Sequence, residues 1–100
     1  MTVRHIVSWR LSGETLAERN AQAEEMTAAL QTLPGKVPSL RSLSVHRNEF
    51  HEGENFDLVL ITEFDDAEGL AEYDAHPDHL AVATITRRNS AGRAAVDFHV

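Results

Sequence analysis

Residues 3–11, with the sequence VRHIVSWRL, alternate in the way expected of a β-strand with two different faces. One face carries Val3, His5, Val7, Trp9 and Leu11, and the other carries Arg4, Ile6, Ser8 and Arg10. The period then changes to that of a helix over residues 12–33, where Leu16, Ala23, Met26, Leu30 and Leu33 form one apolar stripe. Thr15 and Glu18 have the spacing of a capping box, and Pro34 with Gly35 predicts the end of this helix.

Three more strands and two short helices are predicted after this helix. Residues 39–50 indicate a second strand, and residues 56–64 indicate a third, with Phe56, Leu58, Leu60, Thr62 and Phe64 on one face. Residues 65–75 predict a short helix, another short helix begins at Pro77, and residues 93–100 predict the last strand. The order β-α-β-β-α-β is that of the ferredoxin-like fold. We therefore expect one α+β domain over residues 1–100, an antiparallel sheet with helices on one face.

The third predicted strand is apolar on both of its faces. Val59 and Ile61 lie on the face turned away from the helices, and Ile6 of the first strand shares that face. An exposed apolar patch of this kind usually marks an interface. Laying the same face of a second copy against it buries the patch, so we expect a homodimer in which the two sheets form an α/β barrel.

The composition narrows the classes of function. The chain has 100 residues and a net charge of −7, which argues against nucleic-acid and anionic membrane partners because both need clustered Lys and Arg. It has no cysteine, which excludes disulfides, zinc–thiolate sites and a cysteine nucleophile. The N-terminal residues are too short and too alternating for a secretory signal, and no apolar run approaches the ~20 residues of a membrane helix. We expect a cytoplasmic protein.

The stretch EYDAHPDHLA, residues 72–81, contains the only tyrosine and two of the six histidines. In a structural interpretation, Tyr73 packs in the core, His76 precedes a helix that starts at Pro77, and His79 bonds a backbone carbonyl. In a functional interpretation, Tyr73 and His79 converge over the sheet face that carries His5 and Trp9 and form a proton-transfer set. His76 and His79 alone are too few ligands for a metal, and we expect neither a metal site nor a cofactor.

The chain resembles the Dabb family, the stress-responsive dimeric α/β-barrel domain. The resemblance runs through RHIV near the start, FDLVLITEFDDAEGLAEYDAHPDH in the middle and RAAVDFHV at the end. A short helix with a tyrosine followed by HPxH is the most specific part of the pattern. The resemblance implies a ferredoxin-like subunit and a homodimer.

One branch of that family, the polyketide cyclases similar to olivetolic acid cyclase, closes a linear polyketide thioester by a cofactor-free aldol condensation. Its catalytic tyrosine and histidine match Tyr73 and His79, and a further pocket histidine matches His5. Two features depart from that branch. A second pocket histidine falls on Leu58, and the helix aromatics that line its alkyl pocket fall near Ala23, Glu24 and Ala28.

Two functions follow from these observations. The first is a cyclase- or lyase-type enzyme that uses Tyr73 and His79 on a polyketide-like or other carbonyl substrate without a cofactor. The second is a non-catalytic stress-responsive domain that binds a small apolar ligand. For the enzyme we expect a pocket between the helices and the sheet, lined by His5, Val7, Trp9, Met26, Leu30, Leu58 and Leu60. Rings of Tyr73 and His79 packed with no cavity beside them would favour the second function.

Overall fold

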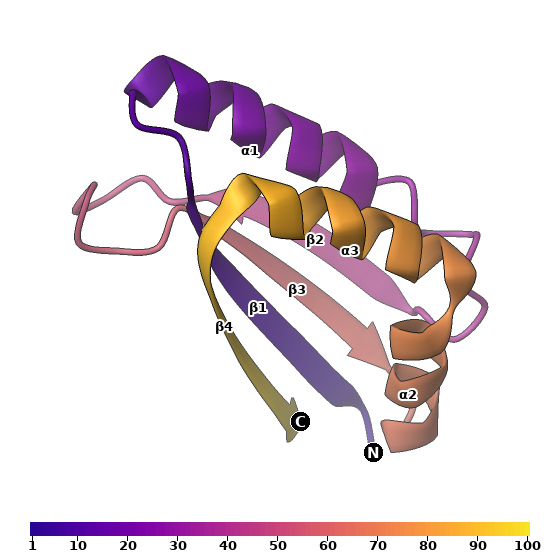
Figure 1. The fold of residues 1–100 in the computed structure, drawn as a ribbon. Coiled ribbons are helices and arrows are strands. Elements are labelled where there is room, and N and C mark those ends of the chain that lie inside the picture. The colour runs from indigo at the N-terminus through magenta and orange to yellow at the C-terminus, as the bar shows by residue number, and fades with distance from the viewer.

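The computed structural model describes residues 1–100 and confirms the ferredoxin-like order of elements. The elements are β1 (Val3–Leu11), α1 (Leu16–Leu30), β2 (Ser42–Arg47), β3 (Leu58–Phe64), α2 (Ala67–Ala75), α3 (Pro77–Asn89) and β4 (Ser90–His99). The four strands form one sheet in the order β2-β3-β1-β4, and every neighbouring pair is antiparallel. Helices α1 and α3 lie over the same face of this sheet, and α2 lies near the end that holds both termini (Figure 1).

The core forms on the sheet face that the helices cover, which we call the inner face. Val7 of β1 lies opposite Leu60 of β3, and Trp9 lies opposite Leu58. All four side chains are buried, as the alternation of residues 3–11 predicts. Met26 completes this layer from α1. Full burial of one such side chain stabilises a fold by about 1.5–3 kcal/mol, so the central strand pair holds much of the domain together.

Helix α1 is shorter at both ends than the predicted range of 12–33, although its capping box lies where the sequence predicts. The side chain of Thr15 accepts a hydrogen bond from the Glu18 backbone, and Glu18 bonds back to the Thr15 backbone, which completes the capping box. The helix ends at Leu30, so Leu33 is buried from the following turn and not from the helix. Leu16 is half exposed, which corrects its place in the apolar stripe, because burial of α1 against the core starts only at Ala23.

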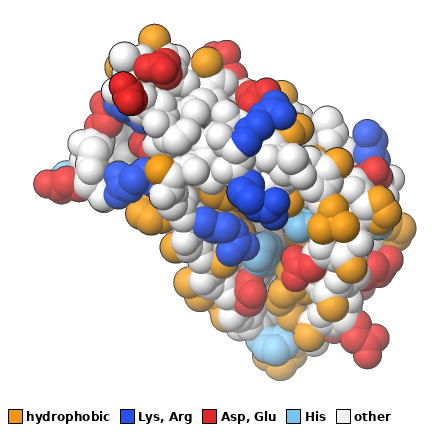
Figure 2. Space-filling view, viewed as in Figure 1, with side chains coloured by type: hydrophobic (Ala, Val, Ile, Leu, Met, Phe, Trp, Pro, Cys, Tyr) orange, Lys and Arg blue, Asp and Glu red, His pale blue; other side chains and the backbone are white.

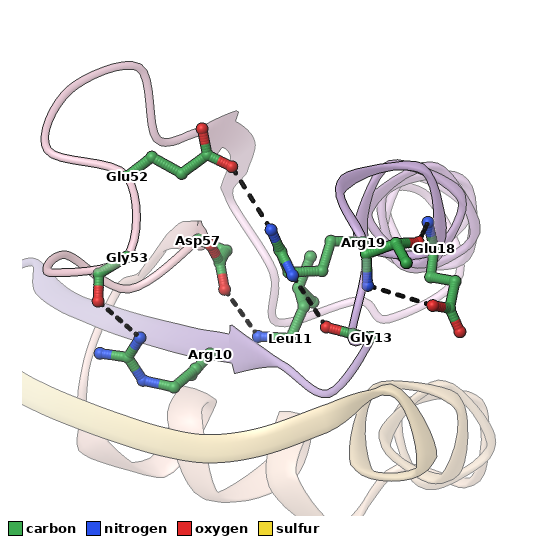
Figure 3. Close-up of polar contacts among 9 residues, drawn as sticks. Arg10, Leu11, Gly13, Glu18, Arg19, Glu52, Gly53 and Asp57 are labelled. Carbon is green, nitrogen blue, oxygen red and sulfur yellow. Dashed lines mark hydrogen bonds and ion pairs between the residues drawn. The ribbon is translucent and has the colours of Figure 1, made fainter.

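Strand β3 also begins later than predicted. Asp57 is buried, its backbone N–H donates to the Trp9 carbonyl, and its carboxylate accepts from the backbone N–H of Leu11 at 2.8 Å (Figure 3). This arrangement precedes the regular pairing, which starts at Leu58. Phe56 is therefore not on the inner face as predicted, and its ring lies instead under the guanidinium of Arg10, 4.8 Å from ring centroid to Cζ.

The loop before β3 is tied to the start of α1. Arg19 donates to the carbonyl of Gly13 at 3.0 Å and forms an ion pair with Glu52 at 3.5 Å (Figure 3). Arg10 donates to the carbonyl of Gly53 in the same loop. These contacts hold the end of the sheet that lies far from both chain termini.

Helix α3 passes into β4 without a loop. The helix runs to Asn89 and the strand starts at Ser90, three residues before the predicted start of 93. Asn89 explains the sharp junction, because its side chain donates to Glu25 of α1 at 2.6 Å and its carbonyl accepts from the backbone of Ser12. These bonds hold the C-terminal end of α3 against α1 and against the segment that follows β1.

The sheet face opposite the helices, which we call the outer face, is apolar at its centre. Ile6 pairs with Ile61 of β3 on one side and with Val96 of β4 on the other. Ile6, Val59 and Ile61 are each half-buried, whereas Val96 is 61% exposed. The register confirms that the side chains expected on this face lie together. No helix of the protein combines the length and apolar character needed to span a membrane.

Candidate functional site

A cavity of about 410 Å³ lies between helix α3 and the inner faces of β1 and β4. This volume falls within the range of about 300–1,000 Å³ that is usual for small-molecule sites. Seven of the residues expected at a site line it: His5, Val7, Trp9, Leu30, Leu60, Tyr73 and His79. Figure 2 shows histidine side chains inside a hollow on this face, with Lys and Arg side chains beside it. The sheet, α2 and α3 thus bring together residues that are far apart in sequence.

Met26 and Leu58 are not among the residues that line this cavity. Met26 is fully buried in the core cluster, where it reaches no open space. Leu58 lies at the far end of β3 and borders a separate groove with Ala23 and Arg47. The sequence predicts correctly that both residues face the core, but it does not predict how far the cavity extends along the sheet.

Tyr73 is the most buried aromatic side chain of the site. It lies in the last turns of α2 and is completely buried, with its ring centroid 5.1 Å from that of Phe64 and 4.2 Å from that of His79. Its hydroxyl is buried and has no hydrogen-bond partner in the protein. Burial raises the pKa of Tyr73 well above its ordinary value, and the negative charge of Asp74 raises it further. At neutral pH this phenol is therefore a hydrogen-bond donor and not a base.

The unpaired hydroxyl leads to a prediction about stability. Leaving a buried polar group without a partner costs about 1–3 kcal/mol, so Tyr73→Phe is expected to stabilise the ligand-free protein by roughly 1 kcal/mol. Chemical denaturation of both proteins measures the difference. A loss of stability of similar size would show that the hydroxyl is bonded in solution.

His79 stands in the first turn of α3, immediately beside Tyr73. Its Nδ1 lies 3.1 Å from the carbonyl oxygen of Asp74. A carbonyl only accepts, so Nδ1 carries the proton and Nε2 of the neutral ring carries the lone pair. Burial lowers the pKa of His79 below its ordinary value, and this outweighs the opposing effect of the Asp74 carbonyl and carboxylate. The positive charge of Arg93 and the nearby His5 lower this pKa further. The ring is thus neutral at pH 7, with Nε2 able to accept a proton.

His5 is held by an acid from the neighbouring strand. It is buried on β1, and its Nδ1 bonds the carboxylate of Asp97, its partner in the register of β4. The ring of His5 lies edge-on to Tyr73, with centroids 6.2 Å apart. The carboxylate fixes the orientation of His5 in the same way as the backbone carbonyl fixes His79.

His76 has the structural place that the sequence predicts. It is the residue before α3, with extended backbone, and its Nδ1 accepts from the backbone N–H of Asp78 at 3.1 Å. Pro77 is the first residue of that helix. His76 is not among the residues that line the cavity.

Because His76 caps α3 and does not line the cavity, we expect substitution by another capping residue to be tolerated. Asn is a favourable helix-capping residue, so His76→Asn is expected to change stability by less than about 0.5 kcal/mol, whereas His76→Ala should lose about 1 kcal/mol. Any ligand affinity should stay within a few-fold in the Asn variant. Thermal denaturation and a binding titration check both statements, and a folded Asn variant that binds nothing would place His76 in the site.

The sequence as a whole matches one family. The family described as Stress responsive A/B Barrel Domain, Dabb, matches residues 3–100. The chain belongs to the Dabb family. No curated protein shows significant similarity to it.

Solved structures agree with the Dabb assignment and with the fold. A dimeric ferredoxin-like protein of unknown function from Bacteroides fragilis is 29% identical, over 99% of this chain and 96% of its own, with a TM-score of 0.88. A dimeric ferredoxin-like protein of unknown function from Thermobifida fusca is also 29% identical, over 100% and 92%, with a TM-score of 0.85. The hydroxynitrile lyase of Passiflora edulis has a similar fold, with 14% identity over 99% and 93% and a TM-score of 0.83.

Three charged residues of this Dabb site were not predicted from the sequence. Asp97, Arg93 and Arg87 surround the predicted histidines from β4 and the last turn of α3. Alternation in residues 93–100 puts Arg93 and Asp97 on one face, but only the register of β4 with β1 shows that this is the inner face, because Asp97 pairs with His5 and Arg93 with Trp9. No group of three or more His, Cys, Asp or Glu side chains in the structure is arranged to hold a metal ion.

Proposed function

We propose that this Dabb protein is a homodimeric, cofactor-independent enzyme of the cyclase or lyase type. It removes a proton next to a carbonyl group of a small substrate bound between α3 and the sheet. His79 is the base, and Tyr73 donates a hydrogen bond to the carbonyl oxygen.

The proposed chemistry balances with these two side chains. Nε2 of His79 takes the proton from the carbon, and the electrons of the C–H bond form an enolate. The negative charge then develops on the carbonyl oxygen to which Tyr73 donates in this proposal, and a donor in a water-poor site is most effective there. In an aldol closure the enolate carbon attacks a second carbonyl, and protonated His79 returns the proton to the new alkoxide. In a lyase reaction the same two groups act in the reverse direction.

One observation carries this proposal. The buried Tyr73 hydroxyl has no partner in the protein, and the ring of a neutral histidine lies against the same tyrosine at the wall of the cavity. Buried polar groups are nearly always hydrogen-bonded, and exceptions call for an explanation. A substrate oxygen supplies the missing acceptor.

The homodimer is part of the proposal. Two of the similar solved structures are of dimeric proteins, and the outer face of this chain presents Ile6, Val59, Ile61 and Val96. Pairing of two outer faces leaves the cavity of each subunit open, because the cavity lies on the inner face. Each subunit then carries its own site.

Proton abstraction can be tested without knowing the natural substrate. β-Keto acids and polyketide-like thioesters are incubated with the protein in D₂O, and NMR follows the exchange of the hydrogens next to the carbonyl. We expect the protein to accelerate exchange of at least one compound, and His79→Gln to remove the acceleration.

The alternative is a non-catalytic domain that binds a small apolar ligand. That function predicts tight binding of uncharged apolar compounds and no exchange with any of them. Binding that is unchanged in Tyr73→Phe and His79→Gln, with no exchange in the wild type, would establish the alternative and overturn the proposal.

A further inference from the structure

Two arginine side chains line the cavity without a partner. Arg87 lies in the last turn of α3, and Arg93 lies on β4 opposite Trp9. Both side chains are exposed, and neither forms a side-chain hydrogen bond or an ion pair within the protein. Four other arginines pair with a carboxylate: Arg4, Arg19, Arg41 and Arg88. The two cavity arginines are therefore free to bind something else.

The surrounding acids do not neutralise this pair. The whole chain has 16 acidic residues and a net charge of −7. Only one acid, Asp74, is among the residues that line the cavity, and it forms no ion pair. Asp97, on the same face of β4 as Arg93, already bonds His5. An acidic protein thus has a cavity with two arginines and one acid, and Figure 2 shows basic side chains gathered beside the hollow.

We propose that Arg87 and Arg93 bind an oxyanion group of the ligand, so that the site takes a carbonyl compound that carries a carboxylate or a phosphate. This inference names the ligand class for the site proposed above and rests on that proposed function. An uncharged apolar ligand would leave both guanidinium groups unused.

The chemistry of the two side chains suits this role. A guanidinium group offers paired N–H donors that match the two oxygens of a carboxylate or phosphate. Because Arg93 and Trp9 are register partners, an anion on Arg93 leaves the rest of the ligand over the apolar floor of Val7, Trp9 and Leu60. Tyr73 and His79 lie at the wall of the same cavity. Anchoring one end of the ligand on Arg93 thus restricts where its carbonyl group lies.

Binding can be measured through Trp9, the only tryptophan of the chain, which lines the cavity. Its fluorescence is titrated with benzoate, with its uncharged analogue benzamide, and with phenyl phosphate. We expect benzoate to bind at least about tenfold more tightly than benzamide. The double variant Arg87→Gln and Arg93→Gln should abolish that preference, and added salt should weaken it in the wild type. Tighter binding of phenyl phosphate than of benzoate assigns the anion to a phosphate, and the opposite order assigns it to a carboxylate.

Arg47→Gln is the matched control. Arg47 carries the same charge and also has no partner, but it borders the grooves near Leu58 and not this cavity. The preference of the Arg47→Gln variant for benzoate over benzamide should stay within twofold of that of the wild type. Equal binding of benzoate and benzamide, an unchanged preference in the double variant, or no binding of benzoate at millimolar concentration would each overturn the inference. His79→Gln separates the two proposals, because it should stop exchange and leave the preference for benzoate intact.

Discussion

Replacing His79 with glutamine is expected to lower the rate of proton abstraction by about 10²–10⁴-fold, the usual cost of losing a general base. Glutamine keeps a planar polar side chain next to Tyr73 but cannot take up a proton. The substrate should therefore still bind, with an affinity that changes much less than the rate. Exchange rates in D₂O, compared with the affinity from Trp9 fluorescence, measure the two effects separately.

The pH dependence gives a second test of the same residue. Burial lowers the pKa of His79 below the ordinary value of about 6.5, so the neutral ring already predominates at that pH. The base is active when neutral, so the rate should rise with pH, level off near neutrality, and have its midpoint below about 6.5. A rate that still rises above pH 7 would indicate a different base. The groups that influence this titration are Asp74, His5 and Arg93.

Stability should follow the same titration with a defined sign. The unfolded chain binds a proton at His79 more readily than the folded protein does. Unfolding is therefore favoured as the pH falls below about 6.5, and the stability lost in this way should be smaller in His79→Gln. The difference between the two proteins reports the titration of His79 together with its coupling to His5.

The control for the rate effect is His76→Asn. This change also removes an imidazole in the same segment, and the ring it removes only caps α3. A large loss of rate in His76→Asn together with full activity in His79→Gln would reverse the assignment of the two histidines.

The alternation of residues 3–11 was enough to place His5, Val7 and Trp9 on the buried face of β1. Strand parity depends on local geometry alone, and the period of 2 is insensitive to small errors in the strand ends. Capping of α1 by Thr15 and of α3 by His76 is equally local, and both are confirmed. These features fix which side chains face the helices.

The rest of the site depends on contacts between distant parts of the chain. The bond between His5 and Asp97 joins residues 92 positions apart, and it requires the register of β1 and β4. Phe56 shows the same limit, because the buried Asp57 shifts the start of β3 through its bond to Leu11. The sequence also cannot show that Arg87 and Arg93 lack a carboxylate partner, because this depends on where the nearby acidic side chains lie in the fold.

The second large effect is expected on dimerisation, from a substitution at Ile61. Ile61 lies at the centre of the outer face, between Ile6 and Ser44 of the neighbouring strands. In the single subunit this side chain is only half-buried, so aspartate at this position can keep contact with water. In a dimer formed through the outer faces, two such carboxylates would be buried close to the two-fold axis without a partner. The cost of burying an unpaired charge is several kcal/mol for each ion.

Ile61→Asp is therefore expected to weaken the dimer by at least about a thousandfold, which corresponds to roughly 4 kcal/mol. Sedimentation velocity at micromolar concentration should show a dimer for the wild type and a folded monomer for the variant. Leu80→Asp is the matched control, since Leu80 is 54% exposed on α3, on the other side of the sheet, and should leave the dimer intact. If the variant monomer does not fold alone, the thermal midpoint of the wild type should rise with protein concentration, because dissociation then accompanies unfolding. A wild-type protein that sediments as a monomer, or an Ile61→Asp variant as dimeric and as stable as the wild type, would exclude the outer face as the interface.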